Sequence, residues 1–355
     1  MRDEQISMDD SKRLISQVEG AYLRRRPLRV RGGDSKAALG RRVDGEEIDT
    51  RTHRGVVSYD PTELVITARA GTPLSELNAI LDAGGQMLPC EPPAFGNGAT
   101  VGGAVAAGLA GPRRPWAGSV RDFVLGCRVI TGEAKHLRFG GEVMKNVAGY
   151  DMSRLLTGSF GCLGLITEVS LKVLPKPRAQ RSLLVELTAA EAMRELSAWR
   201  KTALPISGAC HLDGRLHVRL EGGTDSVAAA ADRIGGAELD LSFWDSLREH
   251  RLAFFDDPCR LWRISLPHAA PVESLPGAEL VDWAGAQRWL KSEAPATTIR
   301  QIATAAGGHA TCFTPPPGET PFQPLPESLL RIHRHLKQRL DPRGIFNPGR
   351  MYAEL

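Results

Sequence analysis

The spacing of apolar residues along the chain predicts five helices. Within residues 9–25, Leu14, Val18 and Ala21 fall on one helical face, an aspartate precedes them as a cap, and Pro27 stops the helix. The same spacing predicts helices over 73–83, 189–201, 226–234 and 328–340.

Runs of β-branched and aliphatic residues predict strands, and the clearest is LGLITEVSLKVL at 163–174. Two more runs, 205–212 and 215–221, flank Asp213-Gly214, a dipeptide typical of a two-residue type I′ hairpin turn. Other strands are predicted over 28–31, 55–60, 63–70, 123–131, 134–139, 182–187, 237–241, 261–267, 279–283 and 309–313.

The order of these elements predicts an α+β fold in more than one part. Over 182–241 the order strand, helix, strand, strand, helix, strand is that of the ferredoxin-like split unit, and a less regular stretch follows it. Pro175 and Pro177 stand just before this unit and predict a boundary. A chain of 355 residues is expected to hold two domains, or one large domain with an insertion.

Small residues crowd the stretch 89–151, and almost no large side chain lies within 96–111. Such a segment brings backbone close to a ligand, and bare N–H groups in turns form anion-binding concavities, so a phosphate-bearing ligand is expected. Arg113, Arg114 and Arg121 are placed to complement its charge. The alternative interpretation is a glycine-rich surface loop.

A second glycine turn, Gly32-Gly33-Asp34-Ser35-Lys36, follows the predicted strand 28–31. No helix with G-x-G-x-x-G follows it and no Walker lysine is present. The turn at 96–102 lacks a preceding strand. Rossmann-type dinucleotide binding is therefore not expected.

Composition and charge exclude several other classes. With 42% hydrophobic and 24% charged residues and a net charge of +4 from scattered basic residues, nucleic-acid binding is not indicated. Six cysteines lie far apart with no C-x-x-C, so no metal site is expected and most should be buried thiols in a reducing compartment. The N-terminus has no signal-peptide core, and the run 99–110 is too short to span a bilayer. A cytoplasmic protein is expected, with any membrane association made through a partner.

Five segments in a fixed order resemble one family. They are RVRGGDS (29–35), ARAGTPLSEL (68–77), ATVGGAVA with GPRRPWAGSVRD (99–122), KNVAGYD with LLTGSFGCLGLITEVSLKVLPKP (145–177) and LDPRGIFNPGR (340–350). They are similar to the vanillyl-alcohol-oxidase or PCMH-type FAD-binding oxidoreductases, particularly the 2-hydroxy-acid branch. The resemblance implies a PCMH-type two-subdomain FAD-binding domain over 1–177, an α+β cap domain over 178–325, and a C-terminal helix and Asn-Pro-Gly tail over 326–355 that return to the FAD domain.

A narrower resemblance rests on WAGSVRDFVLG (116–126), KNVAGYD (145–151), VDWAGAQRWL (281–290) and GGHATCF (307–313) in a chain this short. These segments look like those of a family of FAD-binding subunits of glycolate oxidases. The resemblance implies FAD-dependent oxidation of the CH–OH group of a small 2-hydroxy acid, within a complex that has a second flavin subunit and an iron–sulfur subunit.

The resemblance also implies which residues meet FAD. The loop 31–35 and the turn 100–103 would cradle the pyrophosphate, and 161–166 would run past the adenosine or flavin. For Asp151 a helix cap is an equally good interpretation. The predicted FAD-binding set is Arg31, Gly32, Gly33, Asp34, Ser35, Thr100, Val101, Gly102, Gly103, Gly111, Arg114, Gly118, Ser119, Arg121, Asp122, Lys145, Asn146, Asp151, Gly161, Gly164 and Ile166.

The sequence departs from this family in two ways. The first glycine loop has Asp34 where some relatives have a histidine that tethers FAD, so the cofactor is expected to be non-covalent. The clustered histidines of catalytic relatives are missing, and only His309 remains as a candidate for a flavin-side role. His211 and His217 are predicted to face opposite sides of their hairpin, so they cannot share a metal.

Three functions follow from these observations. The leading one is a redox subunit that binds FAD and takes part in glycolate oxidation within a complex. The second is a self-sufficient FAD-dependent 2-hydroxy-acid dehydrogenase, in which His309 or an arginine orients the carboxylate. The third is a scaffold subunit that has lost its cofactor. The intact glycine turns argue against the third, because a chain without FAD gains nothing from bare backbone.

Overall fold

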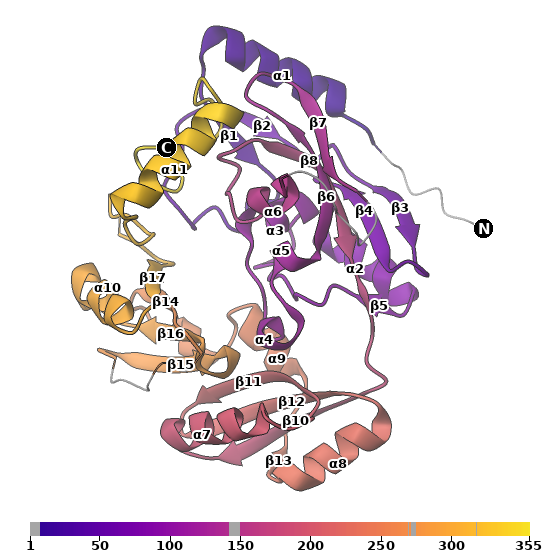
Figure 1. The fold of residues 1–355 in the computed structure, drawn as a ribbon, viewed down its shortest axis with the longest axis vertical. Coiled ribbons are helices and arrows are strands. Elements are labelled where there is room, and N and C mark those ends of the chain that lie inside the picture. The colour runs from indigo at the N-terminus through magenta and orange to yellow at the C-terminus, as the bar shows by residue number, and fades with distance from the viewer. Residues whose placement is uncertain (1–7, 142–149, 269, 271–274, 317) are drawn as a thin grey trace. The chain divides into compact units, whose positions relative to one another are not determined.

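The structure is a computed structural model that describes residues 8–141, 150–268, 270, 275–316 and 318–355. It divides into two compact units (Figure 1), and the α+β class predicted from the sequence is confirmed. Unit 1 comprises residues 1–110, 118–175 and 324–355, and unit 2 comprises 111–117 and 176–323. The sequence analysis placed residues 111–117 in the first domain, but they pack with unit 2.

Unit 1 is built around an antiparallel sheet in the order β3-β4-β8-β6-β7. A separate parallel pair joins β1 and β2, with Arg29 beside Glu47 and Arg31 beside Asp49. The strands are β1 (Leu28–Arg31), β2 (Glu46–Asp49), β3 (Val56–Asp60), β4 (Val65–Arg69), β5 (Gln86–Met87), β6 (Val124–Ile130), β7 (His136–Gly140), β8 (Leu165–Lys172) and β9 (Leu174–Pro175). The helices are α1 (Ser11–Arg24), α2 (Leu74–Ala83), α3 (Val101–Ala107), α5 (Val120–Phe123), α6 (Met152–Leu156) and α11 (Glu327–Leu340).

The core of unit 1 joins the start of the chain to residues far along it. Leu14 and Val18 of α1 pack with Leu28 of β1 and with Ile345 and Phe346, all of them fully buried or nearly so. Burying an aliphatic or aromatic side chain of this size contributes roughly 1.5–3 kcal/mol. Segments on both sides of unit 2 in sequence are therefore needed to complete unit 1.

Unit 2 holds one antiparallel sheet of eight strands, in the order β13-β10-β12-β11-β15-β16-β14-β17. The strands are β10 (Ala179–Glu186), β11 (Ile206–Leu212), β12 (Arg215–Gly222), β13 (Ala237–Glu238), β14 (Leu261–Ser265), β15 (Ala278–Asp282), β16 (Gln287–Lys291) and β17 (His309–Cys312). The helices are α4 (Arg114–Ala117), α7 (Ala189–Trp199), α8 (Thr224–Ile234), α9 (Ser242–Arg248) and α10 (Ala296–Ala305), with 3-10 turns over Ala253–Asp256 and Trp283–Gly285.

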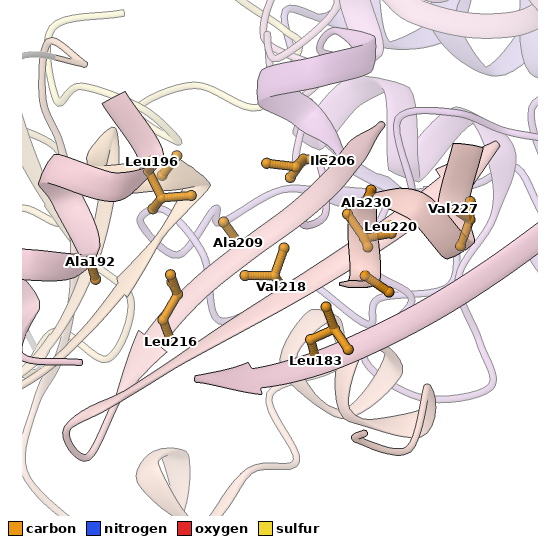
Figure 2. Packing of buried hydrophobic residues seen from close by; sticks show 12 residues of the cluster. Leu183, Ala192, Leu196, Ile206, Ala209, Leu216, Val218, Leu220, Val227 and Ala230 are labelled. Atoms are coloured by element: carbon orange, nitrogen blue, oxygen red, sulfur yellow. The ribbon is translucent and has the colours of Figure 1, made fainter. Parts of the chain in front are cut away.

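The first half of this sheet is the ferredoxin-like unit expected from the sequence. Its four strands lie in the spatial order fourth, first, third, second, and the hairpin turns at Asp213-Gly214 with both residues at positive φ, as a type I′ turn requires. Helices α7 and α8 cover one face (Figure 2), where Leu196 of α7 and Val227 of α8 pack with Val218 of the sheet.

The second half repeats this strand order, which the sequence analysis did not anticipate. Read from the opposite edge, β17, β14, β16 and β15 are again the fourth, first, third and second strands of a four-strand unit. The two halves meet through their second strands, where His211 pairs with Val281. Helix α10 occupies the position of α8, but the described residues between β14 and β15 form no helix corresponding to α7. The irregular stretch predicted after 241 is thus a second, reduced ferredoxin-like unit.

Candidate functional site

A groove in unit 1 is lined mainly by four segments that are distant in sequence. They are the end of β1 with the loop after it, helix α3, the loop before β8 and the residues after α11, and Val43, Thr50 and Ala70 complete the lining. The lining residues are Arg29, Val30, Gly32, Gly33, Asp34, Ser35, Lys36, Ala37, Val43, Thr50, Ala70, Thr100, Gly102, Gly103, Ala106, Ala107, Phe160, Gly161, Gly164, Ile166, Asn347 and Arg350.

The loop after β1 presents bare backbone to this groove. Asp34 has φ +56°, a left-handed conformation that reverses the direction of successive N–H groups. The N–H groups of Gly32, Gly33, Asp34 and Ser35 donate to no acceptor within the described part of the chain. A run of unused N–H groups in a turn is suited to hold an anion, so this loop supports the predicted diphosphate site.

Glycine occupies these positions of the groove for different physical reasons. A Cβ at Gly33 would lie 1.3 Å from the carbonyl oxygen of Gly98, and a Cβ at Gly102 would lie 2.5 Å from the Cβ of Ala70. Both glycines are therefore required for close packing of the protein against itself. At Gly103 the nearest atom is Thr100 Oγ1 at 3.1 Å, so the space beside it is open to a ligand.

Residues 100–103 form the start of helix α3 rather than a free turn. Thr100 caps the helix, and its hydroxyl accepts the N–H of Gly103. The N–H groups of Val101 and Gly102 donate to the carbonyls of Thr72 and Ala70. Their contribution to ligand binding is therefore the bare surface of the helix, since all three donors are used within the protein.

The cations of the groove differ from those chosen by sequence reasoning. Arg29, Lys36 and Arg350 line it, whereas Arg31 does not. The carboxylate of Glu47 raises the pKa of Arg31 through a 2.8 Å hydrogen bond, with a smaller contribution from Asp34. The charge of Arg31 is thereby neutralised beside the groove.

Ten residues of the predicted set line the groove. They are Gly32, Gly33, Asp34, Ser35, Thr100, Gly102, Gly103, Gly161, Gly164 and Ile166. Sequence reasoning missed Arg29, Lys36, Asn347 and Arg350. The family pattern includes the segment LDPRGIFNPGR (340–350), but no local feature of that segment indicates that it lines the groove.

The other predicted residues lie elsewhere or serve local roles. Gly111 and Arg114 belong to unit 2, where the Arg114 guanidinium lies 4.4 Å from the Trp283 ring centre. Val101 is buried beneath the groove. The remaining members outside the lining of the groove are Gly118, Ser119, Arg121, Asp122 and Asp151, while Lys145 and Asn146 lie outside the described residues.

Two of these outlying residues have clear structural roles. Ser119 and Asp122 form the capping box of α5, in which the Asp122 carboxylate accepts the Ser119 N–H at 2.8 Å. Asp151 is the N-cap of α6 and accepts the Arg154 N–H at 3.0 Å. The helix-cap interpretation of Asp151 is therefore confirmed.

One arginine of unit 2 has a side chain without polar partners. The Arg263 side chain in β14 forms no hydrogen bond or ion pair with any described residue, and its Nε is buried. Burial, with the charge of Arg114, lowers the pKa of Arg263 to about 10. Its guanidinium lies 5.3 Å from the Phe313 ring centre. An unpaired guanidinium of this kind is suited to receive a carboxylate.

The histidines offer little acid–base chemistry. His309 is exposed at the start of β17, and burial of its surroundings with the charge of Arg263 lowers its pKa. His211 and His217 face opposite sides of their hairpin, as predicted, and bind the carbonyls of Leu187 and Cys210. Within the described residues no cluster of three metal-binding side chains occurs. Nor is any described helix both long and apolar enough to cross a membrane.

Comparison with known proteins identifies the family of the chain. The family described as FAD binding domain matches residues 6–140. Over 347 residues the chain is 60% identical to "Glycolate oxidase subunit GlcE" of Escherichia coli (strain K12), covering 98% of this chain and 99% of that protein. It is 33% identical over 129 residues to "Glycolate oxidase subunit GlcD" of Bacillus subtilis (strain 168), covering 36% of this chain and 27% of that one.

The chain is also similar to a D-lactate dehydrogenase and to a solved structure. A D-lactate dehydrogenase of Anaerostipes hadrus is 34% identical over 130 residues, covering 37% of this chain and 27% of that one. The structure of an alkyldihydroxyacetonephosphate synthase matches with a TM-score of 0.68 at 17% identity, covering 96% of this chain and 75% of that one. At this identity the structural match supports the fold alone.

Proposed function

The chain belongs to the family of glycolate oxidase subunit GlcE, and from that premise we propose that it is the FAD-binding redox subunit of a glycolate oxidase complex. The observation that carries this proposal is the groove of unit 1. Its unused N–H groups at 32–35 and the cations Arg29, Lys36 and Arg350 fit the diphosphate of a dinucleotide.

FAD, when bound, supplies a two-electron acceptor for the oxidation of a 2-hydroxy acid at its CH–OH group. The residues of the groove bind and orient the cofactor, and the bare surface at Gly103 allows it to approach the protein closely. Asp34 stands where a tethering histidine would be needed. The chain should therefore hold FAD non-covalently.

The partners are inferred from the chemistry that this chain lacks. Oxidation of glycolate to glyoxylate needs a base for the hydroxyl proton and a cation for the carboxylate, both held against the flavin. The described residues offer an unpaired arginine but no clustered histidines. We therefore infer that a second flavin subunit completes the reaction and that an iron–sulfur subunit carries electrons onward.

The experiment that tests this proposal begins with the purified chain alone. It should be yellow, and acid denaturation should release FAD into the supernatant. Alone it should turn over glycolate slowly with a dye acceptor, and partner subunits should restore activity. Flavin that stays with the precipitate would contradict non-covalent binding, and full turnover by the lone chain would contradict an accessory role.

One observation favours a second candidate, in which this chain meets the substrate directly. Arg263 has no carboxylate partner within the described residues and could orient the carboxylate of a 2-hydroxy acid. Under this alternative Arg263→Met raises the KM for glycolate of the whole complex, and added guanidinium ion lowers that KM again. Under the leading proposal the KM of the complex is unchanged.

A further inference from the structure

The segment after α11, residues 341–350 (the return segment), connects two walls of the FAD groove. Asn347 Oδ1 accepts the N–H of Val30 at 2.8 Å, and its Nδ2 donates to the carbonyl of Phe160 at 2.7 Å. Val30 leads into the glycine loop at 32–35, and Phe160 leads into Gly161, so one amide side chain holds both loops. The backbone N–H of Asn347 also donates to Leu28, which fixes the segment along β1.

Arg350 contributes a different feature, a cation without an anionic partner. Its guanidinium donates to the carbonyls of Arg41 and Ala37 at 2.9 Å each, and to the carbonyl of Lys36 at 3.3 Å. It forms no ion pair with any described residue, and burial lowers its pKa. Neutral carbonyls fix the position of a guanidinium but leave its charge uncompensated. The charge of Arg350 is thus available to an anion in the groove that it lines.

The return segment is itself held rigidly. Lys337, the buried lysine of α11, donates to the carbonyls of Cys162 and Phe346 at 2.8 and 2.6 Å and to the Asp341 carboxylate at 2.7 Å. That carboxylate also accepts the N–H groups of Ile345 and Phe346. Because these donors and acceptors are buried, the segment has one arrangement before any ligand arrives.

We propose that the return segment is the closing wall of the FAD site, in which Arg350 supplies the counter-charge for the diphosphate and Asn347 positions the two glycine loops around it. The distribution of charge supports this assignment. Arg29 and Arg31 share the carboxylates of Glu47 and Asp34, whereas Arg350 has none. Of the two arginines that line the groove, Arg350 is therefore the one whose charge no carboxylate pairs with in the described chain. This proposal rests on the proposed FAD binding and concerns only how the cofactor is held. Its failure would leave the assignment to glycolate oxidation unchanged.

The charge of Arg350 is tested by binding to the FAD-free protein. Arg350→Gln should raise the Kd of FAD, and that of ADP, which carries the diphosphate without the flavin, by about tenfold or more. Arg350→Lys should keep the salt dependence of binding and lose less affinity. The matched control is Arg343→Gln: this exposed arginine of the same segment binds the carbonyls of Tyr22 and Leu23 and does not line the groove.

Titration calorimetry at two salt concentrations measures these constants, and far-UV circular dichroism checks that each protein is folded. An Arg350→Gln protein that binds FAD as tightly as the Arg343→Gln protein would overturn the proposal. Weakened FAD binding with unchanged ADP binding would also overturn it, because the charge would then act on another part of the cofactor.

The positioning role of Asn347 is tested with two substitutions that suit its left-handed backbone, φ +40°. Asn347→Gly removes both side-chain hydrogen bonds, and Asn347→Asp keeps the acceptor for Val30 but loses the donor to Phe160. FAD affinity of the folded proteins should fall by about tenfold for glycine and at least as much for aspartate, because its carboxylate faces the Phe160 carbonyl in a groove that holds an anion. Parent-like FAD affinity in both folded variants would show that Asn347 only stabilises the fold and would overturn its role.

Discussion

The charge cluster around Glu221 in unit 2 and the groove of unit 1 treat their buried charges in opposite ways. In unit 2 the Glu221 carboxylate binds Arg113 and lies 3.6 Å from Arg219, and Arg288 binds Glu279 at 3.0 Å. In unit 1 the groove keeps Arg350 against neutral carbonyls, next to backbone N–H groups that have no acceptor in the described chain. Charges that are mutually satisfied hold a fold together, whereas charges held in place and left uncompensated form a binding site. In the unit 2 sheet, Lys291 is likewise held by neutral carbonyls, whereas the Arg263 side chain has no hydrogen-bond partner among the described residues.

The largest effect should come from breaking the charge cluster of unit 2. Glu221→Gln leaves the buried guanidiniums of Arg113 and Arg219 without this carboxylate, and should lower the free energy of unfolding by roughly 3–5 kcal/mol. Urea unfolding measures the loss. Glu238→Gln, which removes an exposed carboxylate 3.6 Å from Arg181, should cost less than about 1 kcal/mol. FAD affinity should stay unchanged in both, and a large loss of affinity in Glu221→Gln would contradict the separation of roles.

A second pair of variants compares two glycines, at each of which a new Cβ would meet only one side-chain oxygen, at 3.1 Å for Gly103 and 3.6 Å for Gly223. Gly103→Val should weaken FAD binding on the order of a hundredfold, because the side chain enters the groove. Gly223→Val in unit 2, where the nearest atom to a new Cβ is Ser226 Oγ at 3.6 Å, should leave it unchanged. Fluorescence titration with FAD gives both constants. Equal affinities would remove the start of α3 from the FAD site.

The third prediction concerns acid stability. Burial lowers the pKa of His250 to about 3, where its ring stacks on Phe255 at 4.1 Å and meets the edge of Trp289. The folded state favours neutral His250, so its contribution is complete above the unfolded pKa of about 6.5 and is lost as the pH falls below it. At pH 5 the loss should be about 2 kcal/mol.

His250→Phe keeps the stacking without the titration. Urea unfolding at pH 7.5 and pH 5 should therefore show a smaller pH dependence in this variant than in the parent. Identical pH dependence in the two proteins would assign the acid sensitivity to other groups, such as His217, whose pKa burial lowers to about 4.

The smallest effect is expected at Asp151. Asp151→Ala removes the cap of α6 and should cost about 1 kcal/mol, while Asp151→Asn should cost less because its side-chain oxygen still accepts the Arg154 N–H. FAD affinity should change in neither. A selective loss of affinity in Asp151→Asn would show that the carboxylate reaches the cofactor.

Local pattern was sufficient for much of this fold. The helix 9–25, the strand 163–174 and the hairpin at Asp213-Gly214 were predicted because their periodicity and turn chemistry act within a few residues. Strand β2 and helix α10 were missed. The sequence EEID (46–49) carries three acids, which are uncommon in strands, and its neighbour β1 supplies arginines that pair with them. The repeated strand order of unit 2 was missed because neither its third strand, β16, nor its helix α10 was predicted.

The candidate site, like the fold, could be predicted from the sequence only in part. The glycine loop at 32–35 was predictable because its residue types indicate directly which backbone conformations the loop can adopt. Which arginines line the groove could not be predicted, since this depends on strand pairing. Arg29 and Arg31 lie on the same side of β1 with Glu47 opposite Arg29, and this register brings both guanidiniums to the Glu47 carboxylate. Asn347 lies 317 positions from its partner Val30, so no local signal connects them.

The insertion of unit 2 within unit 1 has a consequence for the order in which the protein matures. Residues 324–355 follow all of unit 2 along the chain, and they supply Phe346 to the core of unit 1 and Arg350 to the groove. During synthesis, unit 2 has its full sequence before unit 1 does, although unit 1 begins first. The N-terminal part of unit 1 therefore cannot complete its core and groove until residue 350 has been synthesised. Cofactor loading is thereby deferred to a chain that has already folded its other half.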